Sequence, residues 1–138
     1  KNMTRVWRYT SGGVEYFNYA YAQNGCVVYP DLVKLTVCRE TGIVTGMNAE
    51  EYYLNHTERG KFAAKYTMEQ AEDKANDTLT VTARKKAIVP IGNGKETFAY
   101  EFAGTYEGDE YYVFLDADTL KEIKIYKVVE TEEGRLLV

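Results

Sequence analysis

Residues 112–126 read YVFLDADTLKEIKIY, and this stretch decides the fold that the sequence predicts. Apolar and polar residues alternate on both sides of its centre, as expected for two strands that each turn one face toward a core. The central residues 116–119 form turns readily, because aspartate and threonine side chains bond the backbone beside them. The stretch therefore predicts an antiparallel hairpin.

A second copy of this plan lies closer to the start of the chain. Residues 35–47, LTVCRETGIVTGM, again combine an alternating strand, an acidic turn with threonine and a second alternating strand. Upstream of each copy, an alternating aromatic strand leads into a glycine turn. A repeat of roughly 65–75 residues is typical of two copies of one supersecondary unit. The sequence therefore predicts two related units.

Strands dominate both predicted units. The runs that alternate or are apolar are residues 4–10, 14–22, 26–29, 33–38, 43–47, 79–83, 87–91, 98–102, 111–115, 123–128 and 135–138. Two short helices are expected, one over residues 49–56 with Asn48 as N-cap and one after Thr67, where Gln70 completes a capping box. We therefore expect an α+β fold of two units, each an antiparallel sheet with one short helix, the first unit N-terminally truncated.

Tyrosine is the unusual feature of the composition, with 13 Tyr against 5 Phe and 1 Trp. Several flank residues 29–32, YPDL, whose Pro-Asp step predicts a turn. Tyrosine suits half-buried strands and protein interfaces alike. The rings exceed what one small core holds, so we expect some to form an exposed contact surface; packing between the two units is an equally good interpretation. The candidate partner contacts are Tyr19, Tyr21, Tyr29, Asp31, Tyr106 and Tyr111.

Charge and hydropathy exclude several classes of function. The net charge is −4 with both signs interleaved, so no basic surface for nucleic acid is predicted. No run approaches the ~18 apolar residues of a membrane helix. The chain begins without Met or a signal peptide, and we interpret it as part of a longer protein whose anchor lies upstream.

The residues offer little for catalysis, and we expect no enzyme activity, cofactor or bound metal. His56 is the single histidine, without a spacing that completes a catalytic triad. Asp116 and Asp118 could pair as acid and base or hold a cation, but turn formation is the simpler role. Cys26 and Cys38 are either two isolated thiols or a disulfide between adjacent strands. The basic run at residues 84–86 is either a solvated strand edge or a contact for an acidic partner.

Two groups of motifs resemble known families. YTMEQAEDKA at residues 66–75 followed by the 112–126 hairpin resembles a PepSY domain, although Leu120 stands where the family usually has glycine. The segments at residues 16–25, 27–35, 42–59 and 119–138 are similar to the C-terminal region of the YpeB family of spore germination proteins. This resemblance covers nearly the whole chain after residue 14.

The resemblance implies an organisation and a role. It implies a partial PepSY-like unit over residues 1–61 without its leading helix, a PepSY domain over residues 62–138, and a structural clamp formed by Asn55, His56 and Arg59. It also implies a non-catalytic protein outside the cytoplasm, at the spore inner membrane and cortex, that stabilises, localises or restrains the cortex-lytic enzyme SleB. The alternatives are a peptidoglycan-binding module that uses Trp7 and the tyrosines, or a cortex hydrolase.

Overall fold

The structure, a computed structural model, describes residues 2–60, 62–132 and 134–138. The predicted unit boundary at residue 61 and the predicted turn residue Glu133 lie outside these residues. The elements are β1 (Met3–Ser11), β2 (Val14–Gln23), β3 (Cys26–Cys38), β4 (Val44–Asn48), α1 (Glu50–Asn55), α2 (Met68–Ala75), β5 (Thr80–Gly92), β6 (Lys95–Tyr106), β7 (Asp109–Asp116), β8 (Glu122–Thr131) and β9 (Gly134–Leu137). The described chain is thus dominated by sheet, with two short helices.

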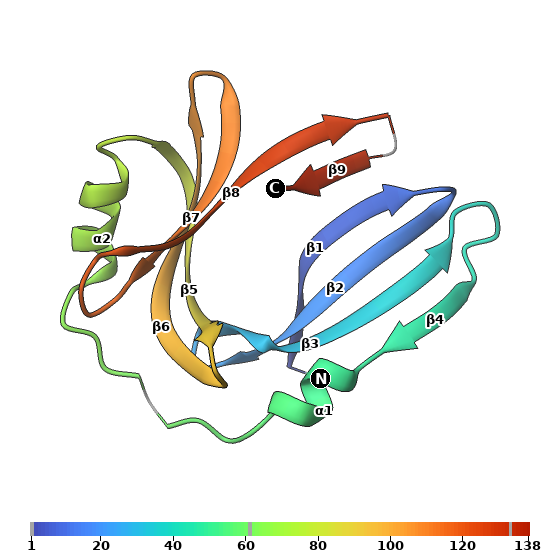
Figure 1. Ribbon diagram of the computed structural model, residues 1–138, viewed down its shortest axis with the longest axis horizontal. Helices are drawn as coiled ribbons and strands as arrows, with labels where there is room; N and C mark the ends of the chain where they lie inside the picture. Colours follow the sequence, from blue (N-terminus) through green and yellow to red (C-terminus); the bar gives the residue numbers. More distant parts are fainter. Residues whose placement is uncertain (1, 61, 133) are drawn as a thin grey trace.

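The strands form two antiparallel meanders that share one curved sheet. β1–β4 pair in sequence, and so do β5–β8. A short parallel pairing joins the meanders, with Cys26–Val28 of β3 opposite Lys86–Ile88 of β5. The β8–β9 hairpin then reaches back over the first meander, so that β9 contacts β1 (Figure 1).

The two meanders repeat one another in hydrogen bonding. The register shifts between Thr36 and Val37 where β3 meets β4, and between Phe114 and Leu115 where β7 meets β8. In the turns that follow, the Gly42 N–H donates to the Cys38 carbonyl at 2.8 Å, and the Leu120 N–H donates to the Asp116 carbonyl at the same distance. The repeat predicted from residues 35–47 and 112–126 is therefore present in the backbone.

Leu120 shows how the second turn works without the usual glycine. Its φ of 58° lies in the left-handed region, as does the 72° of Gly42 at the equivalent position. A leucine there is strained. Its side chain packs against the core beneath α2, and this burial offsets part of the strain.

The sheet has two faces, which we name by what lies on them. On the helix face of β5–β8, Ala71 and Ala75 of α2 pack against Phe102 and Leu115. Small residues let α2 approach the sheet closely, as its narrow apolar stripe predicts. On the opposite cleft face, Ala20 of the first meander and Ala99 and Phe114 of the second share one apolar cluster. The shared cluster makes the two meanders a single packed body.

The predicted turn at YPDL is wrong. β3 runs without a break through this segment, with Val28 opposite Tyr21 and Leu32 opposite Ala20. Residues 29–31 are therefore extra residues in a bulge, where the ladder is already interrupted. Pro30 fits there because it lacks an N–H for a regular ladder. The bulge bends β3 between its pairing with β5 and its pairing with β4.

The helix starts are confirmed in one case and shifted in the other. Thr67 and Gln70 form the predicted capping box of α2, with both reciprocal bonds present. α1 begins one residue later than predicted: Ala49 occupies the N-cap, and Asn48 accepts from the Glu50 N–H at 3.0 Å. The Asn48 side chain therefore still accepts from a backbone N–H of the first helical turn, but Asn48 itself lies one residue ahead of the N-cap. The predicted strands at 79–83 and 87–91 are one strand, β5.

Candidate functional site

The bulge in β3 directs the side chains of Tyr29 and Asp31 into two buried polar clusters. Asp31 is fully buried, with 0% of its surface exposed. Arg59 meets it with a two-pronged ion pair, from Nη1 to Oδ2 at 2.9 Å and from Nη2 to Oδ1 at 3.1 Å. His56 Nδ1 lies 2.7 Å from the same Oδ2. A buried carboxylate requires this compensation, since an unpaired charge there would be very costly.

Arg59 carries this cluster across to the second meander. Its Nε and Nη2 donate to both carboxylate oxygens of Glu96, at 2.8 and 2.7 Å. Gln23 of β2 donates to the Arg59 carbonyl at 2.6 Å. The hydrogen bond with Glu96 is the main reason that the pKa of Arg59 is raised. One guanidinium thereby joins β3 to β6.

The three residues expected to form a clamp lie side by side. Asn55 Nδ2 donates to the Pro30 carbonyl at 3.0 Å, beside the His56 and Arg59 contacts with Asp31. Asn55 is the last residue of α1, and His56 and Arg59 follow it in the connection that leads to the second meander. Their role in holding the halves together stays a prediction, which these contacts make testable.

A second buried cluster surrounds Glu101 of β6, a residue that the sequence analysis missed. Its side chain accepts from the Tyr29 hydroxyl, and Lys85 Nζ lies 3.4 Å from its other oxygen. Glu101 is 1% exposed, and burial raises the pKa of its carboxyl. Burial also raises the pKa of the Tyr29 hydroxyl. A glutamate in the apolar run FAYEFAG was the available signal of a buried charge.

Two of the candidate partner contacts are corrected by this geometry. Tyr29 is 8% exposed and Asp31 is fully buried, so their expected exposure is wrong. The reason is the bulge, which turns both side chains inward instead of presenting them at a turn. Tyr21 is half-buried and packs against the rings of Tyr52 and His56. Tyr19 is also half-buried, on the same side of β2.

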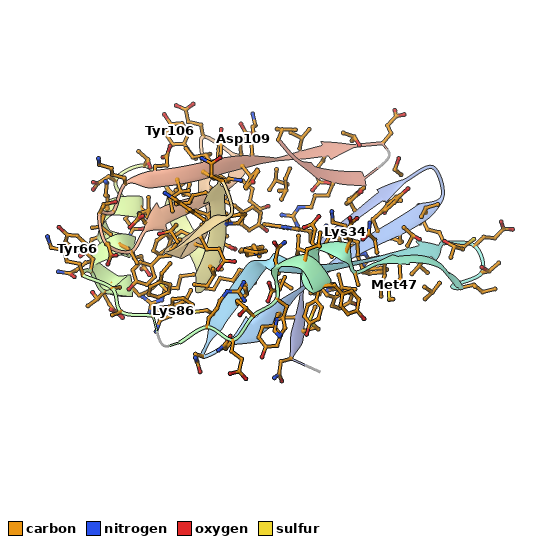
Figure 2. The ribbon with its side chains drawn as sticks, turned by 60° about the horizontal axis from the view of Figure 1, so that its bottom comes forward. Lys34, Met47, Tyr66, Lys86, Tyr106 and Asp109 are labelled. Atoms are coloured by element: carbon orange, nitrogen blue, oxygen red, sulfur yellow. The ribbon has the colours of Figure 1, made fainter. Side chains whose placement is uncertain are left out.

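Tyr106 is exposed at the surface, and Tyr111 beside it is half-buried. They face each other across the β6–β7 hairpin with ring centroids 6.5 Å apart, and Tyr106 is 47% exposed. Figure 2 shows Tyr106 and Asp109 at the tip of this hairpin, on the outside of the molecule. Tyr106 has the exposure that a protein contact needs, whereas Tyr111 packs partly against the core beneath α2.

A cleft of about 450 Å³ lies on the cleft face, lined by Tyr29, Leu32, Phe114 and Tyr126 among others. Trp7, which we considered as a stacking surface for sugar, borders it. Its ring stacks on Tyr29 at 5.8 Å and meets Tyr112 and Tyr126 edge-on at 5.3 and 6.5 Å. The tryptophan therefore packs between the two meanders.

The remaining candidates have local structural partners. Asp116 Oδ1 accepts from the backbone N–H groups of Asp118 and Thr119, as expected of a turn former. Arg84 forms an ion pair with Glu72 of α2 at 2.9 Å. Cys26 and Cys38 are free thiols at opposite ends of β3, a separation too large for a disulfide.

Two further features are absent from the residues that the structure describes. No cluster of three or more His, Cys, Asp or Glu side chains lies in a geometry that could hold a metal ion. Within the same residues, neither helix has the length and hydropathy that crossing a membrane requires.

Two family models match this chain. Residues 1–62 match the model described as YpeB sporulation, PepSY1 and PepSY2 domains, and residues 65–126 match the model described as peptidase propeptide and YPEB domain, PepSY. The two matches follow one another along the chain and together reach from β1 into β8.

Curated and solved relatives agree with the family models. Sporulation protein YpeB of Oceanobacillus iheyensis is 30% identical over 119 residues, 86% of this chain and 26% of the relative. YpeB of Halalkalibacterium halodurans is 30% identical over 91% of this chain and 28% of the relative. The structure of the Bacillus megaterium YpeB C-terminal domain superposes with a TM-score of 0.86 at 30% identity, covering 92% of this chain and 57% of that one. The chain thus spans about a quarter of the length of the curated relatives.

Proposed function

Because this chain carries PepSY-family sequence and is homologous to the sporulation protein YpeB, we propose that it acts in spore germination as a non-catalytic binding module. The proposed partner is a cortex-lytic enzyme resembling SleB, which the module would stabilise, localise or restrain in the dormant spore. The proposed location is outside the cytoplasm, at the inner membrane and cortex, with an anchor upstream of this region.

The proposed organisation is two PepSY-like α+β units, residues 1–61 and 62–138. The support is the shared four-stranded meander, with the same register shift before the same turn in each half. The first unit would lack the leading helix that α2 supplies to the second.

The observation that carries the proposal is the ion-pair chain that runs from the buried Asp31 through the buried Arg59 to Glu96 at the surface. It ties the connection after α1 to both meanders, in addition to their shared apolar cluster. A body fixed in this way loses little conformational freedom when it binds, which favours affinity. The chain would therefore work as a rigid scaffold that presents side chains to a protein.

The contact surface would include Tyr106 and Tyr111. Tyrosines at an exposed hairpin tip are typical anchors, because each ring offers a large apolar area and a hydroxyl at low entropic cost. Tyr19 and Tyr21 are half-buried and would add contact area only at their edges.

Catalysis is a weaker alternative, because the candidate catalytic side chains already have structural partners. His56 is already engaged with Asp31, and Asp116 with its own turn. A hydrolase predicts that the purified chain lowers the turbidity of decoated spores or releases reducing sugar; we expect neither.

A peptidoglycan-binding module is the second alternative, and the packing of Trp7 among three tyrosines speaks against it. That alternative predicts that the chain sediments with purified cortex in the absence of any protein.

The proposal is tested by a pull-down of the immobilised chain against a recombinant SleB-like enzyme. The catalytic and wall-binding domains are offered separately. Retention of one domain supports the proposal and locates the contact, and a subsequent lysis assay distinguishes inhibition from stabilisation. Absence of retention for both domains contradicts the proposed partner.

A further inference from the structure

The cleft of about 450 Å³ between the meanders has a floor of packed aromatic rings. Phe114 meets Tyr29 edge-on at 5.7 Å and Tyr126 edge-on at 6.1 Å, and Trp7 stacks on Tyr29 at 5.8 Å. The cleft volume lies in the range of roughly 300–1,000 Å³ over which protein clefts bind ligands. Because aromatic rings stack on one another or meet edge-on, this floor favours a flat apolar group.

The rim of the cleft is open at the turn between β5 and β6. Figure 1 shows this turn and α1 at the same end of the molecule, and residues of both line the cleft. Gly92 and Gly94 form part of the rim, and a Cβ built on either would meet no atom within 4 Å. A polypeptide backbone therefore has room to lie across the turn.

The charges at the rim are unbalanced. Among the described residues, two carboxylates and two lysines line the cleft. Glu51 and Glu96 are each neutralised by an ion pair, at 2.8 and 2.7 Å. Lys95 and Lys124 are exposed, and within the described part of the chain neither ammonium group has a hydrogen-bond or ion-pair partner. The rim thus carries two uncompensated positive charges on a chain whose net charge is −4.

A peptide is the class of ligand that uses all three features. Its aromatic side chain would add to the ring floor, the carboxylate of a neighbouring residue would reach a rim lysine, and its backbone would cross the open turn. An aromatic residue that enters a pocket commonly supplies a large share of the binding energy of such a contact. A free aromatic acid offers the ring and the charge but nothing that crosses the rim, so it serves below as a comparison.

We propose that this cleft binds a peptide segment of a partner protein in which an aromatic residue adjoins an aspartate or glutamate. The ring would lie against Phe114 and Tyr126, and the carboxylate would meet Lys95 or Lys124. The site is separate from the proposed contact at Tyr106, since Lys95 and Tyr106 are the first and last residues of β6. The inference does not depend on the partner being a lytic enzyme, and failure of that partner leaves it unaffected.

The first experiment is a selection from a library of random short peptides displayed on phage, with the whole chain immobilised as bait. We expect enrichment of peptides in which an aromatic residue stands next to an acidic one. An enriched peptide without tryptophan is then synthesised and titrated into the chain. Trp7, the single tryptophan, borders the cleft and reports binding through its fluorescence. We expect a saturable change in its emission.

Charge reversal at the rim tests the acidic half of the proposal. Lys95→Glu combined with Lys124→Glu should weaken binding of the synthetic peptide by about tenfold, because two attractions become repulsions. The weakening should become smaller at high salt, which screens exposed charges. The matched control is Lys65→Glu combined with Lys121→Glu, which changes the net charge equally at exposed positions outside the cleft. Its affinity for the peptide should equal that of the wild type.

Several results would overturn the proposal. One is a selection that enriches no peptide, or peptides without adjoining aromatic and acidic residues. Another is an equal loss of affinity in the two double variants, which would indicate general attraction to the chain instead of a site. A peptide that binds without altering Trp7 emission would place the contact outside the cleft. Equal affinity for the peptide and for 3-phenylpropionate would assign the cleft to a small acid and contradict a peptide occupant.

Discussion

At the scale of single residues, the molecule depends on charges that it has removed from water. Asp31, Arg59 and Glu101 are each less than 10% exposed, and each is matched by a partner from another element. Such groups contribute little when paired, but breaking a pair leaves a buried charge alone. Substitutions at these residues therefore report directly on the two buried polar clusters, around Asp31 and around Glu101.

Asp31→Asn should lower the free energy of unfolding by about 3–5 kcal/mol, because the amide keeps the shape but not the charge that Arg59 requires. Urea denaturation measures the loss. Asp77→Asn, at an exposed position after α2, is the matched control and should change the free energy by less than about 0.5 kcal/mol. Equal effects at both positions would show that the buried ion pair has no special weight.

Glu101→Gln should alter how stability depends on pH. Burial holds the pKa of Glu101 above its ordinary 4.5, so the folded protein retains this proton where the unfolded chain has lost it. The wild type therefore loses stability relative to the variant as pH rises from about 4.5 through the raised pKa. Below 4.5 the difference should be constant.

The measurement is urea denaturation of both proteins at a series of pH values from 4 to 8, written as the difference between their free energies of unfolding. Other titrating groups are common to both and cancel. A difference that does not vary with pH would mean that Glu101 ionises in the folded state as readily as in the unfolded one.

At the scale of elements, α2 is held by its own first turn as well as by the sheet. Thr67→Ala removes the side chain that accepts from the Gln70 N–H, and should cost about 1 kcal/mol. Thermal unfolding should then shift downward by about 4 °C. Thr78→Ala, exposed and beyond the helix, is the control. An equal shift for both threonines would count against the capping role.

The sequence predicted such local features well. A capping box needs only four neighbouring residues, and the two hairpin repeats need only alternation and a turn, so both can be recognised without tertiary context. The α2 start and the repeat were therefore predicted correctly.

Features that depend on a neighbouring strand could not be predicted in this way. YPDL has the composition of a turn, but β2 pairs with β3 on both sides of it and keeps the chain extended. The parallel pairing of β3 with β5 is equally invisible in either strand alone. Tyr29 and Asp31 were expected at a surface for this reason.

At the scale of the whole molecule, the candidate site was predicted in part. A family resemblance predicts Asn55, His56 and Arg59 as a clamp, and the fold brings Asn55 to Pro30 and the other two to Asp31. Their partner Glu96 is 37 residues from Arg59 and lies in another strand, so no spacing rule finds it. Pairing between distant charges is decided by the fold, not by local pattern.

Tyr106→Ala combined with Tyr111→Ala should weaken binding to the lytic enzyme by tenfold or more, roughly the loss of one interface hot spot. Tyr106 is exposed, but Tyr111 packs against the core beneath α2, so the double variant should also have a lower thermal midpoint, and binding is measured well below that temperature. The control pair is Tyr9→Ala with Tyr16→Ala, two rings that stack at 4.6 Å on β1 and β2 away from this hairpin. Unchanged affinity for the first pair would remove the hairpin from the contact surface.

The central claim is that this chain binds a cortex-lytic enzyme without chemistry of its own. The most direct measurement is a calorimetric titration of the chain against the separate catalytic and wall-binding domains of a SleB-like enzyme. The account predicts saturable heat with one domain at a one-to-one ratio, and a weaker curve for the Tyr106→Ala, Tyr111→Ala protein. Absence of heat with both domains, at several temperatures, would contradict it.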